Sequence, residues 1–222
     1  MLQSLGAVLR MPVQPGEVYP LIRERSPVLW PMVLVAAVGV VTGLVMLPAL
    51  QEIAMRQVAL DPNLPEEAAA MVGPITTISA LIGGALGQIF WALIAAALMA
   101  VAVLFTGGRL PYRLALSLSL TAYGPVLLAS LLVAVMTAAG VVEFPTGTET
   151  SAAMFLGREA AGTLLYRLLA LIDPFEWWYI ALLAGGIRAL ADTTPRAGWV
   201  IAVLVWLVLF GGPTLLATSV AL

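Results

Sequence analysis

Long apolar stretches, separated by short polar connections, make up most of this chain. Two of them, residues 28–50 and 75–105, contain no charged side chain at all. Three further stretches are also mostly apolar and cover residues 114–139, 174–190 and 195–218. A helix that crosses a bilayer needs about 20 consecutive apolar residues. The pattern therefore predicts about five membrane-spanning helices, of which the second is long enough to be tilted or to begin before the bilayer.

Composition supports the same fold class. The 222 residues are 62% hydrophobic and only 10% charged, with a mean hydropathy of +1.05. A soluble domain has roughly 45–50% apolar and about 25% charged residues, so this chain has too little polar surface to cover a soluble globule. We expect an all-α, polytopic transmembrane helical bundle that forms a single domain over residues 1–222, with the lipid bilayer as its first partner.

The absent residue types exclude several kinds of site. The chain has no cysteine and no histidine, which removes disulfides, thiolate chemistry, the commonest general base and the commonest transition-metal ligand. It also has no basic tract that would bind nucleic acid. None of the familiar catalytic or nucleotide-binding motifs is present. We therefore expect no enzyme, no cofactor, no metal and no nucleic-acid partner.

The fourth apolar stretch has a clear helix start. Asp173 is placed as N-cap, Pro174 as the first helical residue and Glu176 as the third, a pattern that satisfies amide groups at a helix start. The shorter apolar run 162–172 lies before it. It predicts an interfacial or re-entrant helix, and the alternative is one long helix 163–190 with a proline kink. We favour a break, because Asp173 and Glu176 would otherwise lie deep in lipid.

Other segments carry weaker signals. Leu2, Leu5 and Leu9 could form one stripe of a short helix on the membrane surface. Residues 61–67 indicate a turn followed by a short helix, and residues 140–161 indicate a loop. Gly211-Gly212-Pro213 is expected to break or kink the fifth span near its end.

The arginines alternate between the two sides of the predicted bundle. One side holds seven arginines and three acids, and the other holds three arginines and nine acids. The seven are Arg10, Arg23, Arg25, Arg109, Arg113, Arg188 and Arg196. Short arginine-rich loops stay in the cytoplasm. This distribution predicts a multi-pass protein of the bacterial cytoplasmic (inner) membrane, with its N-terminus cytoplasmic and its C-terminus outside.

Small and polar residues within the spans are the candidate contact sites. Gly39 and Gly43 form one GxxxG pair, and Gly83 and Gly87 form another. Such pairs let helices approach closely, either within one chain or on an oligomer face. Gln88 lies near the middle of the second span, where an amide needs a partner. It indicates either a structural contact or the polar lining of a substrate path.

The start of the fourth span carries the remaining candidates. Intramembrane acids can relay protons, but helix capping at the outer interface explains Asp173 and Glu176 more simply. Trp177, Trp178 and Tyr179 follow them and predict an aromatic belt at the level of the headgroups.

Several of these stretches together resemble the Yip1 family. The run Asp173-Pro174-Phe175-Glu176-Trp177-Trp178, followed by the glycines Gly185 and Gly186, is similar to the start of the fourth span in that family. The stretch from Met11-Pro12 to Ile22 resembles the lead of its bacterial members, with Tyr19 as the aromatic residue. Tyr123-Gly124-Pro125 resembles an element of the third span, with its spacing shortened by one residue.

The resemblance implies five spans, a cytoplasmic N-terminus and a membrane-organising or transport-associated role rather than catalysis. Eukaryotic relatives bind small prenylated GTPases, but this chain lacks their long cytoplasmic N-terminal domain, so we do not carry that partnership over. Two hypotheses follow. The first is a protein that works by helix–helix association with itself, as a homo-oligomer, or with other membrane proteins. The second is a small transporter or channel, or an accessory subunit of an ABC exporter.

Overall fold

The computed structural model is a bundle of helices and describes residues 2–60, 65–142, 149–160 and 162–216. Four of its helical segments are long and apolar enough to cross a membrane, and there are five if a bent pair of helices counts as one span. No strand occurs in the described parts of the chain. The predicted fold class, an all-α transmembrane bundle, is therefore confirmed.

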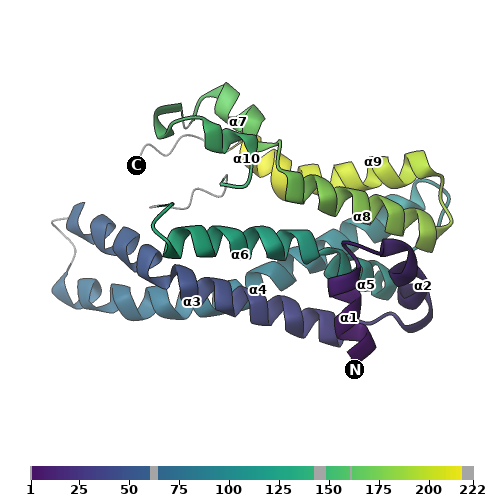
Figure 1. Ribbon diagram of the computed structural model, residues 1–222, viewed down its shortest axis with the longest axis horizontal. Helices are drawn as coiled ribbons and strands as arrows, with labels where there is room; N and C mark the ends of the chain where they lie inside the picture. Colours follow the sequence, from purple (N-terminus) through teal and green to yellow (C-terminus); the bar gives the residue numbers. More distant parts are fainter. Residues whose placement is uncertain (1, 61–64, 143–148, 161, 217–222) are drawn as a thin grey trace.

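The first two spans form a long antiparallel hairpin. Helix α3 (Leu29–Leu60) has 32 residues and α4 (Glu66–Leu104) has 39, which gives lengths of about 48 and 58 Å at 1.5 Å per residue. Both exceed a hydrocarbon core of about 30 Å, and in Figure 1 the hairpin extends beyond the end of α6. The expected separate short helix after residue 61 is wrong, because α4 is continuous from Glu66.

The third span is divided into two helices. Helix α5 (Tyr112–Ala122) and helix α6 (Gly124–Ala138) meet at Tyr123, a boundary inside the span that the sequence predicted over 114–139. Pro125 explains the interruption, because proline donates no amide hydrogen bond and its ring collides with the carbonyl four residues earlier. The two helices together still form one segment of 27 residues, long enough to cross a membrane.

A break precedes the fourth span, as the sequence predicted. Helix α7 (Leu164–Ala170) and helix α8 (Pro174–Ala191) are bent by 49° at the connection between them. The alternative of one helix with a proline kink is wrong. Before α7, the segment expected to be a loop contains two short 3₁₀ helices, η1 (Ala152–Phe155) and η2 (Arg158–Ala160).

The fifth span is disturbed earlier than expected. Helix α9 (Pro195–Trp206) passes into a π-helical turn, η3 (Leu207–Gly211), and then into α10 (Gly212–Leu216). The π turn lies before Pro213, whose missing amide leaves the preceding carbonyls without their usual partner. At Gly212 an added Cβ would lie 2.7 Å from the Leu207 carbonyl oxygen, so a glycine fits this wide turn.

Two short helices precede the spans and pack across one end of the bundle. Helix α1 (Leu2–Arg10) and helix α2 (Pro15–Arg25) lie beside α5 and α8. The buried face of α1 consists of Ala7 and Val8, while Leu9 is 72% exposed, as a surface stripe would be. The other two leucines of the predicted stripe lie outside the residues whose side chains are described.

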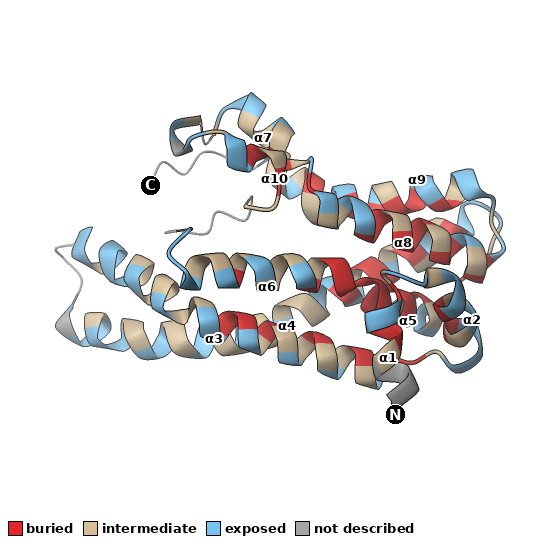
Figure 2. Ribbon diagram, viewed as in Figure 1, coloured by how far each residue is buried: buried red, intermediate tan, exposed pale blue. Residues whose placement is uncertain are grey.

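The core lies at the same end of the bundle as α1 and α2. Figure 2 shows buried residues gathered in α5, α8 and the first part of α9, whereas the far ends of α3 and α4 are mostly exposed. Large apolar side chains such as Ile82, Leu86 and Phe90 are more than half exposed along α4. In water such a surface would be costly, and a surrounding bilayer removes that cost.

Candidate functional site

Glycines bring the backbones of α3 and α4 into direct contact. A Cβ added at Gly39 would lie 1.9 Å from the Gly84 carbonyl oxygen, and one added at Gly43 would lie 2.5 Å from the Ala80 carbonyl oxygen. No real side-chain atom fits at such distances. The first predicted GxxxG pair therefore packs inside one chain, against Gly84 and Ala80 of the next span.

The second predicted pair lies on a different face of α4. A Cβ added at Gly83 or Gly87 would meet no atom of the described residues within 4 Å. The structure therefore does not bring the two predicted pairs together. The partner of Gly39 is Gly84, a residue that the four-residue spacing did not single out, and it is only one position from Gly83. Since consecutive residues on a helix are about 100° apart, Gly83 and Gly84 point in different directions.

Polar groups between these two spans are only partly paired. The Gln51 side chain donates a hydrogen bond to the Thr77 hydroxyl at 3.1 Å. The Oε1 atom of Gln88 is buried and has no hydrogen-bond partner in the described parts of the chain. Two described cavities lie at the end of the bundle that carries α2, and Gln88 lines neither.

The acid at the start of α8 is a buried helix cap. Asp173 is 5% exposed, and its Oδ1 atom accepts hydrogen bonds from the amides of Phe175 at 2.8 Å and Glu176 at 3.2 Å. Its second oxygen accepts a hydrogen bond from the Thr150 hydroxyl. Pro174 occupies the first helical position. The same carboxylate thus joins the segment before η1 to the start of α8.

Glu176, which the sequence pattern assigned to helix capping together with Asp173, contacts another helix instead. Its Oε2 atom accepts a hydrogen bond from the indole nitrogen of Trp206 at 2.7 Å, which ties α8 to α9. The ring of Trp177 lies 5.7 Å from that of Trp206, and its indole nitrogen donates to the Leu171 carbonyl at 3.0 Å. Trp177 and Trp178 are 45% and 38% exposed, as an interfacial belt requires.

Tyr179 does not belong to that belt. It is fully buried, and its ring lies 5.6 Å from the ring of Tyr123 and 6.4 Å from that of Phe210, both in edge-on arrangements. The junction of α5 and α6, helix α8 and the end of the fifth span therefore meet around one aromatic ring. The period of α8 turns Tyr179 inward while the adjacent Trp178 faces out, which the run of three aromatic residues did not reveal.

Residues from distant parts of the sequence meet on the inner face of α8. The Tyr19 hydroxyl of α2 donates a hydrogen bond to the Leu182 carbonyl at 2.9 Å, and a Cβ added at Gly185 would lie 2.5 Å from that hydroxyl. The next glycine, Gly186, faces Leu118 of α5 in the same way, at 2.2 Å. The two glycines of α8 thus leave space for one side chain each.

The Tyr19 hydroxyl remains a hydrogen-bond donor at all ordinary pH values. Burial raises the pKa of Tyr19 to about 12, from an ordinary 10.0. Since the folded pKa is above the unfolded one, the contribution of this group to stability is fully present below pH 10. It is lost only as the pH rises toward the folded value.

The chain before the first span also contacts the boundary between α5 and α6. A Cβ added at Gly124 would lie 2.9 Å from Pro12 and 3.2 Å from the Val8 carbonyl oxygen. Gly124 directly follows Tyr123, which contacts Tyr179. The three segments around Pro12, Gly124 and Gly185 therefore pack together at the end of the bundle that carries α1 and α2.

These features define a class: a polytopic α-helical membrane protein whose last two spans are organised around an acid-capped, glycine-containing helix. The model of the Yip1 domain matches residues 9–216, nearly the whole chain. The chain therefore belongs to the Yip1 domain family. No curated protein and no solved structure gives a match.

Proposed function

We propose that this protein is a non-enzymatic, membrane-organising or transport-associated protein that acts through helix–helix association, with itself or with other membrane proteins. One observation carries the proposal: within the described residues, a Cβ added at Gly83 or Gly87 of α4 would meet no atom within 4 Å. Small residues in a lipid-facing stripe allow a second helix to approach closely. Ile82, Leu86 and Phe90 flank the stripe with exposed apolar surface that would pack beside such a helix.

The assembly test compares two positions on the same helix. Replacing both Gly83 and Gly87 with leucine should block close approach and reduce crosslinked oligomers or recovered partners by at least tenfold. Gly73→Leu is the control, because a Cβ at Gly73 is equally open but lies about 15 Å along the helix from Gly83 at 1.5 Å per residue. In-membrane crosslinking followed by quantitative mass spectrometry measures both. Unchanged recovery from the double variant would show that this face is not used.

A transporter, or an accessory subunit of an ABC exporter, is the second candidate. The buried, unpartnered Oε1 atom of Gln88 favours it, because a polar path through the spans needs such groups. Flux of protons, ions or lipids in proteoliposomes that Gln88→Leu abolishes would support this function over association alone.

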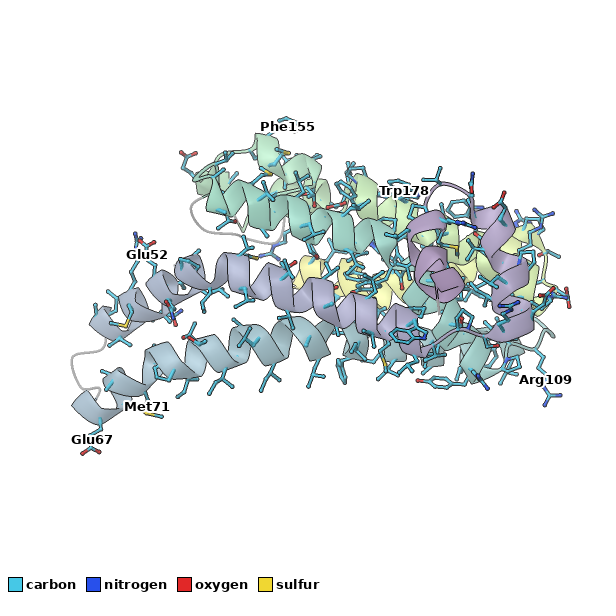
Figure 3. The ribbon with its side chains drawn as sticks, turned by 60° about the horizontal axis from the view of Figure 1, so that its bottom comes forward. Glu52, Glu67, Met71, Arg109, Phe155 and Trp178 are labelled. Carbon is cyan, nitrogen blue, oxygen red and sulfur yellow. The ribbon has the colours of Figure 1, made fainter. Side chains whose placement is uncertain are left out.

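We further propose that the protein lies in a bacterial inner membrane with its arginine-rich end in the cytoplasm. Supporting this orientation, the loop after α4, the α8–α9 connection and α2 lie at one end of the bundle. An exposed ion pair at 2.8 Å joins Arg23 of α2 to Asp192 after α8. Glu52 and Glu67 lie at the opposite end from Arg109 (Figure 3). Short arginine-rich connections favour the cytoplasmic side.

The absence of native cysteine permits a direct topology test. Glu67→Cys and Thr106→Cys place single thiols at exposed positions of the two ends. A membrane-impermeant maleimide should label the first in intact spheroplasts and the second only after lysis. Labelling of Thr106→Cys before lysis would reverse the orientation.

A further inference from the structure

A cavity of about 330 Å³ opens at the arginine-rich end of the bundle, between the last turn of α2, the first turn of α3 and the first turn of α5. Two cationic side chains, Arg25 and Arg113, are part of its wall. The apolar part of the wall includes Val28, Leu29, Trp30 and Met32. Charge and apolar surface thus face the same space.

Two local features place these side chains together. Ser26 ends α2 in the left-handed conformation, with φ 44°, and so turns the chain sharply between Arg25 and the start of α3. The buried Ser117 hydroxyl of α5 then donates a hydrogen bond to the Pro27 carbonyl at 2.8 Å. Arg113 is four residues before Ser117 and shares its face of α5. The bond that holds the connection therefore also sets Arg113 beside it.

We propose that this cavity binds the headgroup of an anionic phospholipid. Guanidinium groups are suited to phosphate, because their planar forks donate paired hydrogen bonds to its oxygens. The apolar wall matches the glycerol and the first methylene groups of the acyl chains, and Trp30 suits the headgroup level. A free inorganic anion would gain nothing from that apolar wall. The volume accommodates a headgroup with the start of its chains, while the remaining acyl chain stays in the bilayer.

Not every arginine at this end is arranged in the same way. Arg109 and Arg196 line neither described cavity. Figure 3 shows Arg109 at the end of the molecule, pointing away from the helices. These two arginines provide a matched control for nonspecific attraction between basic residues and anionic lipid.

The test is native mass spectrometry of the full chain, titrated in detergent with phosphatidylglycerol, phosphatidylcholine or inorganic phosphate. We expect retained phosphatidylglycerol adducts and much weaker phosphatidylcholine adducts. Arg25→Gln combined with Arg113→Gln should weaken phosphatidylglycerol binding roughly twentyfold, since each arginine near an anionic headgroup contributes about a fivefold factor. Arg109→Gln combined with Arg196→Gln removes the same charge and should leave the affinity within about twofold.

Several results would overturn the proposal. If the two double variants lose equal affinity for phosphatidylglycerol, the lipid is attracted by basic residues in general and not by this cavity. Equal binding of phosphatidylcholine would show that the arginines do not select charge, and competition by inorganic phosphate at similar concentration would identify a free-anion site. Trp30→Ser tests whether the apolar wall contributes to binding, because it keeps both arginines. It should weaken phosphatidylglycerol binding and leave any binding of inorganic phosphate unchanged. Unchanged lipid affinity in Trp30→Ser would contradict the cavity. None of these outcomes depends on helix–helix association at Gly83.

Discussion

Replacing Gly39 with leucine is expected to destabilise the α3–α4 hairpin by about 3 kcal/mol or more, the upper range for overpacking a closely packed site. The reason is the 1.9 Å that would separate an added Cβ from the Gly84 carbonyl oxygen. A backbone atom cannot rotate away as a side chain can, so the two helices must separate. Titration of the detergent-solubilised protein with dodecyl sulfate, followed by circular dichroism, measures the loss.

Gly83→Leu is the control for this prediction. It introduces the same side chain on the opposing helix, one position from Gly84, but where an added Cβ meets no described atom within 4 Å. Its effect on the stability of the single chain should be within about 0.5 kcal/mol, as for other exposed substitutions. If the two variants lose equal stability, the α3–α4 contact is not the one described. If Gly83→Leu alone loses stability, the lipid-facing assignment of that residue is wrong.

Replacing Asp173 with alanine is expected to cost about 2 to 4 kcal/mol. The loss of an N-cap costs roughly 0.5–2 kcal/mol, and polar groups left buried without a partner add about 1–3 kcal/mol. The amides of Phe175 and Glu176 and the Thr150 hydroxyl all donate to this carboxylate. Thermal unfolding in detergent, together with hydrogen exchange of the two amides, reports the loss.

Asp173→Asn separates the cap from the charge. Asparagine caps helices about as well as aspartate, so it should restore most of the stability that alanine loses and keep the two amides protected. Its amide nitrogen takes the place of the second oxygen and can donate to the Thr150 hydroxyl, which is able to accept as well as donate. Should asparagine be as damaging as alanine, the negative charge rather than the hydrogen-bonded cap would be the stabilising feature. Exchange rates unchanged in Asp173→Ala would contradict the cap itself.

The start of α8 was predictable because it is a local feature. The order of Asp173, Pro174 and Glu176 satisfies amide groups within one turn of the chain, and no distant residue is needed to recognise it. The position of Glu176, by contrast, depends on α9. Its carboxylate accepts a hydrogen bond from Trp206, 30 residues away, and no pattern around residue 176 points to that indole.

The glycines are a second example of a contact that a local sequence pattern does not determine. The spacing of Gly83 and Gly87 resembles a packing motif as strongly as that of Gly39 and Gly43. Only the rotation of α4 about its axis, set by its contacts with α3, turns Gly84 inward and leaves Gly83 facing out. The positions of the glycines along the chain do not determine that rotation.

The sequence alone determined the membrane class and the break before α8, because each follows from the free energy of one segment in lipid or of one helix start. The tertiary structure decided which glycines touch, how Tyr19 meets Gly185 and how Arg25 comes beside Arg113. These pairs are separated by 45 to 166 positions along the chain. Their contacts depend on the packing of several helices at once, which no local pattern specifies.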